Sequence, residues 1–96
     1  MNLREEIIAL KVKEVMSREK QYAFPQFMRL VRKSLGMTRK AIANMLQVSE
    51  SKINYLENGK FTRGPDLEFV ATLAHFYGLE GPFVMKKLDN YREFGR

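Results

Sequence analysis

Apolar side chains recur every three to four residues along most of the chain, which places them on one face of an α-helix. The stretch nearest to a strand pattern contains Pro25, which lacks the backbone N–H that strand pairing needs. The pattern therefore predicts an all-α fold, a compact bundle of about five to six short helices. We expect helices over residues 3–19, 25–35, 66–77 and 82–94, and two short helices that begin at about residues 39 and 50.

The first predicted helix, residues 3–19, carries two adjacent apolar stripes. We expect this wide face to pack on the chain's own core, and the alternative is a surface for a partner protein or a second copy. The stripes are Leu3, Ile7 and Leu10, and Ile8, Val12 and Val15.

The predicted helix over residues 66–77 is apolar on two sides, so we expect it to be the central helix of the core or part of an interface. The amphipathic helix over residues 82–94 is placed where a dimer contact could form.

Two N-cap signals stand close together in the middle of the chain. Thr38 and Ser49 are good N-caps, and each has an apolar residue before it and another four positions after it. The two short helices that they start are separated by three or four residues, which is the spacing of a helix-turn-helix unit.

The second of these helices has a polar outer face. Ile53 and Leu56 point inward, whereas Ser51 and Tyr55 point the opposite way, with Asn54 on one flank. Such side chains suit base edges in a major groove, although an ordinary solvated helix surface has a similar composition. Asn54 could pair with adenine, and Glu50 could accept a hydrogen bond from cytosine.

Glu57 lies in the last turn of the same helix, where the helix dipole disfavours an acid. A nearby cation would offset this cost. Arg32, on the preceding predicted helix, is the partner that we expect.

The formal net charge is +6, and all of this excess comes from residues 29–63, which hold eight bases against two acids. A concentrated basic region attracts a polyanion.

The sequence offers little for other chemistry. It has no Cys and one His, so it lacks the spacing of a metal site, and we expect no metal or other cofactor. No nucleophile has a neighbouring base, and no Gly-rich phosphate loop occurs, so we expect no enzyme. No apolar run reaches the length of a membrane span, and the N-terminus lacks a signal-peptide pattern, so we expect a cytoplasmic protein without membrane contact, nucleoid-associated when bound to DNA.

Residues 28–79 resemble the lambdoid phage repressor and Cro-like (XRE-type) helix-turn-helix family of bacterial and phage transcriptional regulators. The resemblance rests on the segment 32–39, on Ala41-Ile42-Ala43, on Val48-Ser49, on Ile53 and on Leu56-Glu57-Asn58-Gly59-Lys60. It implies a lambda-repressor-like DNA-binding domain with a central helix-turn-helix.

The resemblance also implies roles for single residues. It places base contacts on Glu50, Ser51, Asn54 and Tyr55, and an internal ion pair on Arg32 and Glu57. It makes Arg39 a phosphate contact that also supports the reading helix. It makes residues 60–63 a loop that follows the DNA backbone. Together with the charge pattern, this predicts phosphate contacts from Arg39, Lys40, Lys52, Lys60 and Arg63.

Two positions depart from the family pattern. The usual glycine of the turn is Gln47, which is strained if its φ is positive. The first base-reading position is the acidic Glu50, where Gln or Arg is commoner, and this affects the target sequence.

We therefore expect a sequence-specific double-stranded DNA-binding regulator, a homodimeric repressor that reads a palindromic operator through the major groove. The alternatives are an antitoxin that binds a protein toxin and represses its own promoter, and a protein-interaction module with weak DNA binding. Residues 1–22 would be an N-terminal amphipathic extension, residues 23–79 the DNA-binding domain, and residues 80–96 a C-terminal helix with a possible dimer contact.

Overall fold

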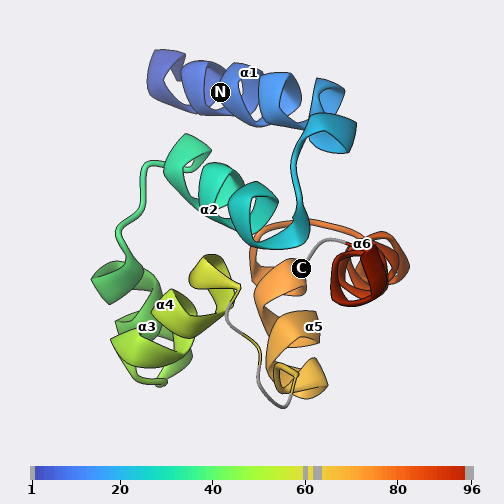
Figure 1. Ribbon diagram of the computed structural model, residues 1–96. Helices are drawn as coiled ribbons and strands as arrows, with labels where there is room; N and C mark the ends of the chain where they lie inside the picture. The colour runs from blue at the N-terminus through green and yellow to red at the C-terminus, as the bar shows by residue number, and fades with distance from the viewer. Residues whose placement is uncertain (1, 60, 62–63, 95–96) are drawn as a thin grey trace.

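The computed structural model describes residues 2–59, 61 and 64–94 (Figure 1). In these residues every regular element is helical, which confirms the all-α prediction. The elements are α1 (Leu3–Ser17), the short 3₁₀ helix η1 (Glu19–Gln21), α2 (Phe24–Ser34), α3 (Arg39–Leu46), α4 (Glu50–Asn58), α5 (Leu67–Phe76) and α6 (Gly81–Phe94).

Local capping explains where several helices begin. The side chain of Asn2 accepts a hydrogen bond from the backbone N–H of Glu5 at 2.8 Å, and the side chain of Asp66 accepts from the backbone N–H groups of Glu68 and Phe69. Pro25 occupies the first turn of α2, where no intrahelical N–H bond is lost.

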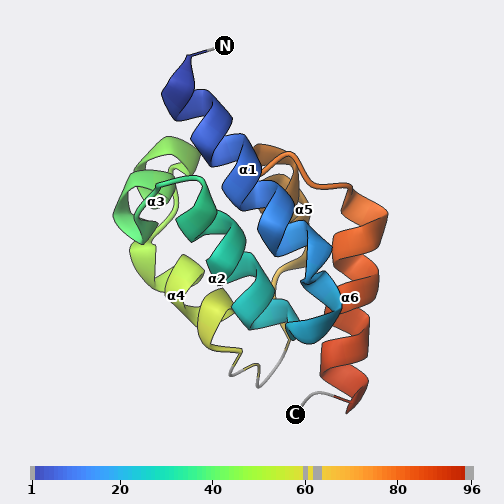
Figure 2. The ribbon, with the colours of Figure 1, turned by 90° about the horizontal axis from the view of Figure 1, so that it is seen from above.

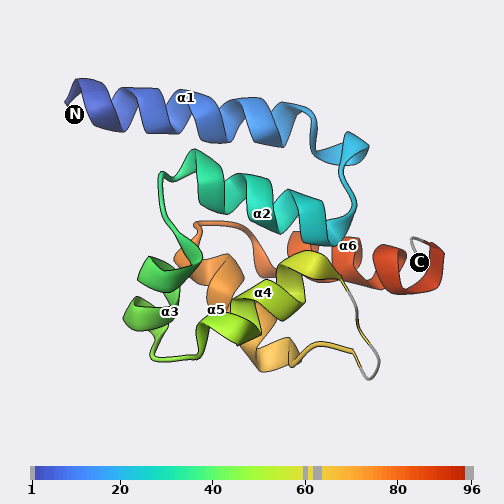
Figure 3. The same cartoon turned by 60° about the vertical axis from the view of Figure 1, so that its left-hand side comes forward.

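Helix α2 lies at the centre of the molecule. It packs against α1, α4 and α6, and its side chains Phe24, Phe27, Met28 and Val31 are fully buried. Figures 1 and 3 show α1 on one side of α2, and α4 and α5 on the other.

Of the two places expected for residues 66–77, the centre of the core is taken by α2, and a place in an interface stays a prediction. Helix α5 buries Phe69, Val70, Leu73 and Ala74, but Leu67 on its first turn is half exposed. The helix therefore covers the core from one side, and α2 takes the central place because it is flanked on three sides.

Helix α1 forms an outer layer over α2, and its N-terminal end projects past the body of the bundle (Figure 2). None of its residues is buried. The stripe of Ile8, Val12 and Val15 is half buried, whereas Leu3 and Leu10 are 71% and 66% exposed. The expectation that α1 packs on the core was therefore right for one stripe only, because a helix with one neighbour can bury only one face.

Among the described residues, no helix combines the length and the apolar character that crossing a membrane requires.

Two tyrosines differ in how their hydroxyl groups are satisfied. The Tyr91 hydroxyl donates a hydrogen bond to the backbone carbonyl of Gly59 at 3.0 Å. The Tyr77 hydroxyl is buried without a hydrogen-bond partner among the described residues. Burial also raises the pKa of Tyr77, so this phenol stays neutral.

We expect Tyr77→Phe to raise the free energy of unfolding by about 1 kcal/mol, because it removes a buried polar group that has no partner. Tyr91→Phe is the matched control and should lower it by about 1 kcal/mol, because it breaks a hydrogen bond. Urea denaturation of both variants measures the difference, and a loss of stability in Tyr77→Phe would contradict the expectation.

Candidate nucleic-acid interface

Helices α3 and α4 form the helix-turn-helix that the two N-cap signals predict. The hydroxyl of Thr38 accepts from the backbone N–H of Ala41 at 3.1 Å, and the hydroxyl of Ser49 accepts from that of Lys52 at 3.2 Å. The inward sides of the two helices meet through Ile42, Ala43, Ile53 and Leu56, all of which are buried.

The turn between the two helices depends on the backbone of Gln47, which has φ 57° and ψ 43°. The backbone N–H of Val48 bonds to the carbonyl of Ala43 at 3.0 Å, and that of Gln47 bonds to the carbonyl of Asn44 at 3.4 Å. This is the Schellman pattern that ends a helix at a left-handed residue. Glycine takes this conformation without strain, and a residue with a side chain does not.

The carboxylate of Glu57 is the centre of a buried ion network. Its oxygens accept hydrogen bonds from Arg32 Nε at 2.8 Å, from Arg32 Nη2 at 3.0 Å and from Arg39 Nε at 3.0 Å. The Glu57 side chain is 0% exposed. The structure thus brings Arg32 and Glu57 together and adds Arg39 to the pair.

This network joins three helices and the loop between two of them. Arg32 belongs to α2, Arg39 to α3 and Glu57 to α4, and Arg32 Nη1 also donates to the carbonyl of Met37 at 2.8 Å. The hydrogen bond to Glu57 raises the pKa of Arg32 above its ordinary value, although burial acts in the opposite direction. The two guanidinium groups offset the unfavourable place of an acid at the C-terminal end of a helix.

The outer face of α4 is exposed and polar. Glu50, Ser51 and Asn54 are exposed, and Tyr55 is 37% exposed. Asn58 Nδ2 donates to Asn54 Oδ1 at 3.1 Å, which orients the amide of Asn54. The four residues expected to read bases therefore share one face of α4, on the side of the helix away from Ile53 and Leu56.

The structure places the predicted phosphate contacts in different surroundings. Lys40 is exposed, whereas Arg39 is half buried against Glu57. The ammonium group of Lys52 lies 3.3 Å from Asp66 Oδ2 and 4.8 Å from the centre of the Phe69 ring. Lys60 and Arg63 lie outside the described residues.

The pairing of Lys52 with Asp66 has a local cause. Asp66 caps α5, and its pKa is lowered first by the backbone N–H of Phe69 and then by the Lys52 ammonium, so it stays ionised. Because the pair is exposed, it contributes little stability, and a phosphate could compete for Lys52.

The C-terminal end of α4 is held by a contact that sequence reasoning missed. Gly59 has φ 69°, and a Cβ atom there would lie 2.6 Å from Cγ of Pro25. The hydroxyl of Tyr91, on α6, bonds to the carbonyl of the same glycine. The sequence shows only that Gly59 ends a helix, since nothing local relates it to a tyrosine on another helix.

A family described as a helix-turn-helix domain matches residues 26–82, which is more than half of the chain. The chain belongs to this family. The match includes most of α2 and all of α3, α4 and α5, and it leaves α1 and most of α6 outside. A helix-turn-helix domain indicates a DNA-binding regulator, with DNA as its partner. No curated protein and no solved structure matches the chain.

We expect Gln47→Gly to raise the free energy of unfolding by about 1 kcal/mol, because glycine adopts a left-handed backbone without the Cβ clash. Met45→Gly, two residues earlier at an exposed position inside α3, should instead lower it by about 0.5–1 kcal/mol. Thermal unfolding of both variants tests the pair, and equal losses would show that the turn is unstrained.

Removal of the Glu57 side chain should lower the free energy of unfolding far more than a change in the turn does. We expect Glu57→Ala to lower the free energy of unfolding by about 3–5 kcal/mol, because it leaves a buried guanidinium without its counter-charge. Arg39→Ala should cost about 1 kcal/mol, since Arg32 still pairs with Glu57. Lys33→Ala, an exposed change on α2, is the control, and denaturant titrations that rank Glu57→Ala with it would refute the role of the network.

Proposed function

We propose that the protein is a sequence-specific regulator of transcription that binds double-stranded DNA by placing α4 in the major groove. One observation carries this proposal. The outer face of α4 presents a row of exposed polar residues, while its opposite face is held by buried apolar contacts and by the Glu57 network. A helix that is rigid on one side and polar on the other suits base reading.

The four residues of this face have different chemistry toward bases. Asn54 would pair with adenine through its amide, because its Oδ1 accepts one hydrogen bond from Asn58 and keeps a second lone pair, and its N–H groups are free to donate. Glu50 would accept a hydrogen bond from the exocyclic amine of cytosine. Ser51 and Tyr55 would add hydrogen bonds from their hydroxyl groups beside these two residues.

The basic residues around α4 would hold the DNA backbone, which sets register but reads no sequence. Arg39 and Lys40, on the first turn of α3, would bind one phosphate group. Lys52 would do so by leaving Asp66, and Lys60 and Arg63 would follow the backbone after α4. If a dimer neutralises about six to eight phosphates, the logarithm of the affinity should fall with the logarithm of salt concentration at a slope of roughly −5 to −7.

We propose further that the protein acts as a homodimeric repressor of the lambdoid repressor and Cro-like type, on a palindromic operator in the cytoplasm. A two-fold dimer doubles the base contacts and selects half-sites about 34 Å apart. The dimer contact expected on residues 80–96 stays a prediction. Val84 and Leu88 are fully buried in the chain's own core, so such a contact would use the remaining surface of α6.

A second function is favoured by one feature of α1. Leu3, Ile7 and Leu10 form an exposed apolar stripe at helical spacing, and exposed apolar stripes of this kind mark protein contacts. An antitoxin that binds a toxin through α1 and represses its promoter through α4, or an interaction module with weak DNA binding, would use that surface. Co-purification with a small toxin would separate the first from a lone repressor.

Selection of bound DNA from a random pool tests the proposal, and we expect a preferred palindrome. With the selected palindrome as target, Asn54→Ala should weaken binding by about 1–3 kcal/mol and relax the preference at one base pair. Lys40→Ala should weaken binding to all sequences alike and flatten the salt slope by about one unit.

Lys13→Ala, on the helix that lies away from α4, removes the same charge and should leave the affinity unchanged. Selection that yields no preferred sequence at moderate salt would refute base reading and favour the interaction module. A salt slope near zero in the unmutated protein would contradict the phosphate contacts.

A further inference from the structure

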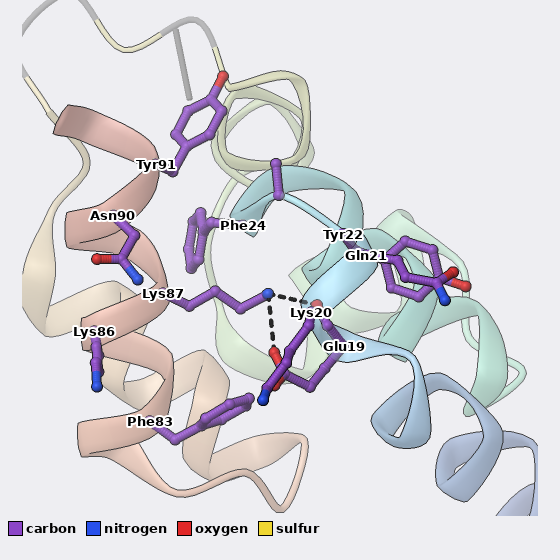
Figure 4. A pocket seen from close by; sticks show the side chains of 11 residues that line it. Glu19, Lys20, Gln21, Tyr22, Phe24, Phe83, Lys86, Lys87, Asn90 and Tyr91 are labelled. Atoms are coloured by element: carbon purple, nitrogen blue, oxygen red, sulfur yellow. Dashed lines mark hydrogen bonds and ion pairs between the residues drawn. The ribbon is translucent and has the colours of Figure 1, made fainter. Parts of the chain in front are cut away.

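A groove of about 580 Å³ lies between α6 and the segment that joins α1 to α2. Figure 4 shows α6 on one side of it, and η1 with the start of α2 on the other. Its volume falls within the range of sites that bind small molecules, which is about 300–1,000 Å³. Among the residues that the structure describes, none of those proposed to contact DNA lines it.

Aromatic rings supply the apolar part of the groove. Phe83 and Tyr91 are half buried and present ring surface to the groove, whereas Phe24 is fully buried and presents none. The rings are held from behind, since Phe83 packs edge-on against Phe27 at 5.8 Å between ring centres and Tyr91 is fixed through its hydroxyl to Gly59. The groove therefore presents aromatic surface that is already in position.

Positive charge surrounds these rings. The ammonium group of Lys87 donates to the backbone carbonyl of Glu19 at 2.6 Å and to its carboxylate at 3.1 Å, so the one acid among the described residues of the lining is neutralised (Figure 4). Lys20 and Lys86 are exposed and have no ion-pair partner in the part of the chain that the structure describes. Asn90 adds an exposed amide donor.

We propose that this groove binds a small planar aromatic carboxylate. The aromatic ring of such a ligand would pack against Phe83 and Tyr91, and its carboxylate would be held by Lys86 and the amide of Asn90, which are neighbours on one face of α6, while Lys20 adds positive charge from the η1 side. A cationic analogue would meet two unpaired ammonium groups, and an anion without a ring would leave the aromatic surface uncovered. Both parts of the groove therefore select the same ligand class.

The groove also connects to the reading helix. Tyr91 packs edge-on against Phe61 at 5.7 Å between ring centres, and Phe61 packs against Tyr55 of α4 at 5.6 Å. A ligand that displaces Tyr91 would alter its bond to Gly59, at the C-terminal end of α4, and the ring contact behind Tyr55. This consequence rests on the proposed DNA-binding function, whereas ligand binding itself does not.

Indole derivatives provide a matched set of probes, because the chain has no Trp and the fluorescence of the probe can be observed alone. Anisotropy titrations without DNA would compare indole-3-acetate (anionic), tryptophol (neutral) and tryptamine (cationic). We expect saturable binding of indole-3-acetate, with an affinity about tenfold higher than that of either analogue. A tenfold difference corresponds to one charge-assisted hydrogen bond. Acetate in equal excess should not displace it.

Two charge reversals locate the site. Lys86→Glu should weaken indole-3-acetate binding about tenfold. Lys13→Glu changes the net charge equally on α1, outside the groove lining, and should leave binding unchanged. Circular dichroism spectra would confirm that both variants are folded. Equal effects of the two variants, tighter binding of tryptamine or the absence of binding by indole-3-acetate would each overturn the proposal.

The link to DNA is measured separately. Saturating indole-3-acetate should change the affinity for the selected operator about threefold or more, and operator DNA should change the affinity for the probe by the same factor. An unchanged operator affinity at saturation would overturn the link through Tyr91. A chain that binds indole-3-acetate but no DNA would refute the proposed function and leave the ligand site standing.

Discussion

The buried carboxylate of Glu57 is the interaction on which the arrangement of α2, α3 and α4 depends. Its side chain is excluded from solvent and accepts hydrogen bonds from two guanidinium groups on two other helices. A carboxylate in such a place is costly unless it is fully paired, so the three helices cannot shift independently. Because Arg32 also bonds to the carbonyl of Met37, the loop before α3 belongs to the same unit.

This constraint explains how a short helix can present side chains in a defined geometry. Helix α4 has nine residues and would be marginal alone, since isolated helices of this length are weak in water. Its inner side is held by Ile53, Leu56 and Glu57, and its C-terminal end by the bond from Tyr91 to Gly59. The exposed face therefore carries residues whose backbone is positioned by the core and not by their own contacts.

The molecule has three chemically different surfaces. Figure 3 shows α4 on one side of α2 and α1 on the other. Helix α4 carries the exposed polar face, and α1 carries the exposed apolar stripe. The cationic, aromatic groove beside α6 is a third surface. Under the proposed function, DNA and a second partner could be bound at the same time, and the aromatic contacts from Tyr91 through Phe61 to Tyr55 would connect the groove with the reading face.

The sequence by itself determined the all-α fold and the two capped helices of the motif, because these signals act within one or two turns of the chain. The family resemblance marked Gln47 as strained if its φ is positive, and the structure decided that it is left-handed. Only the tertiary structure decided which stripe of α1 is covered, that Lys52 pairs with Asp66, and that Tyr91 holds Gly59. Helical periodicity says that a face is apolar, but its burial depends on which distant element lies against it. The pairs of Lys52 with Asp66 and of Tyr91 with Gly59 leave no local pattern and follow from the packing of the helices, whereas the acid at the end of α4 already indicated a cation such as Arg32.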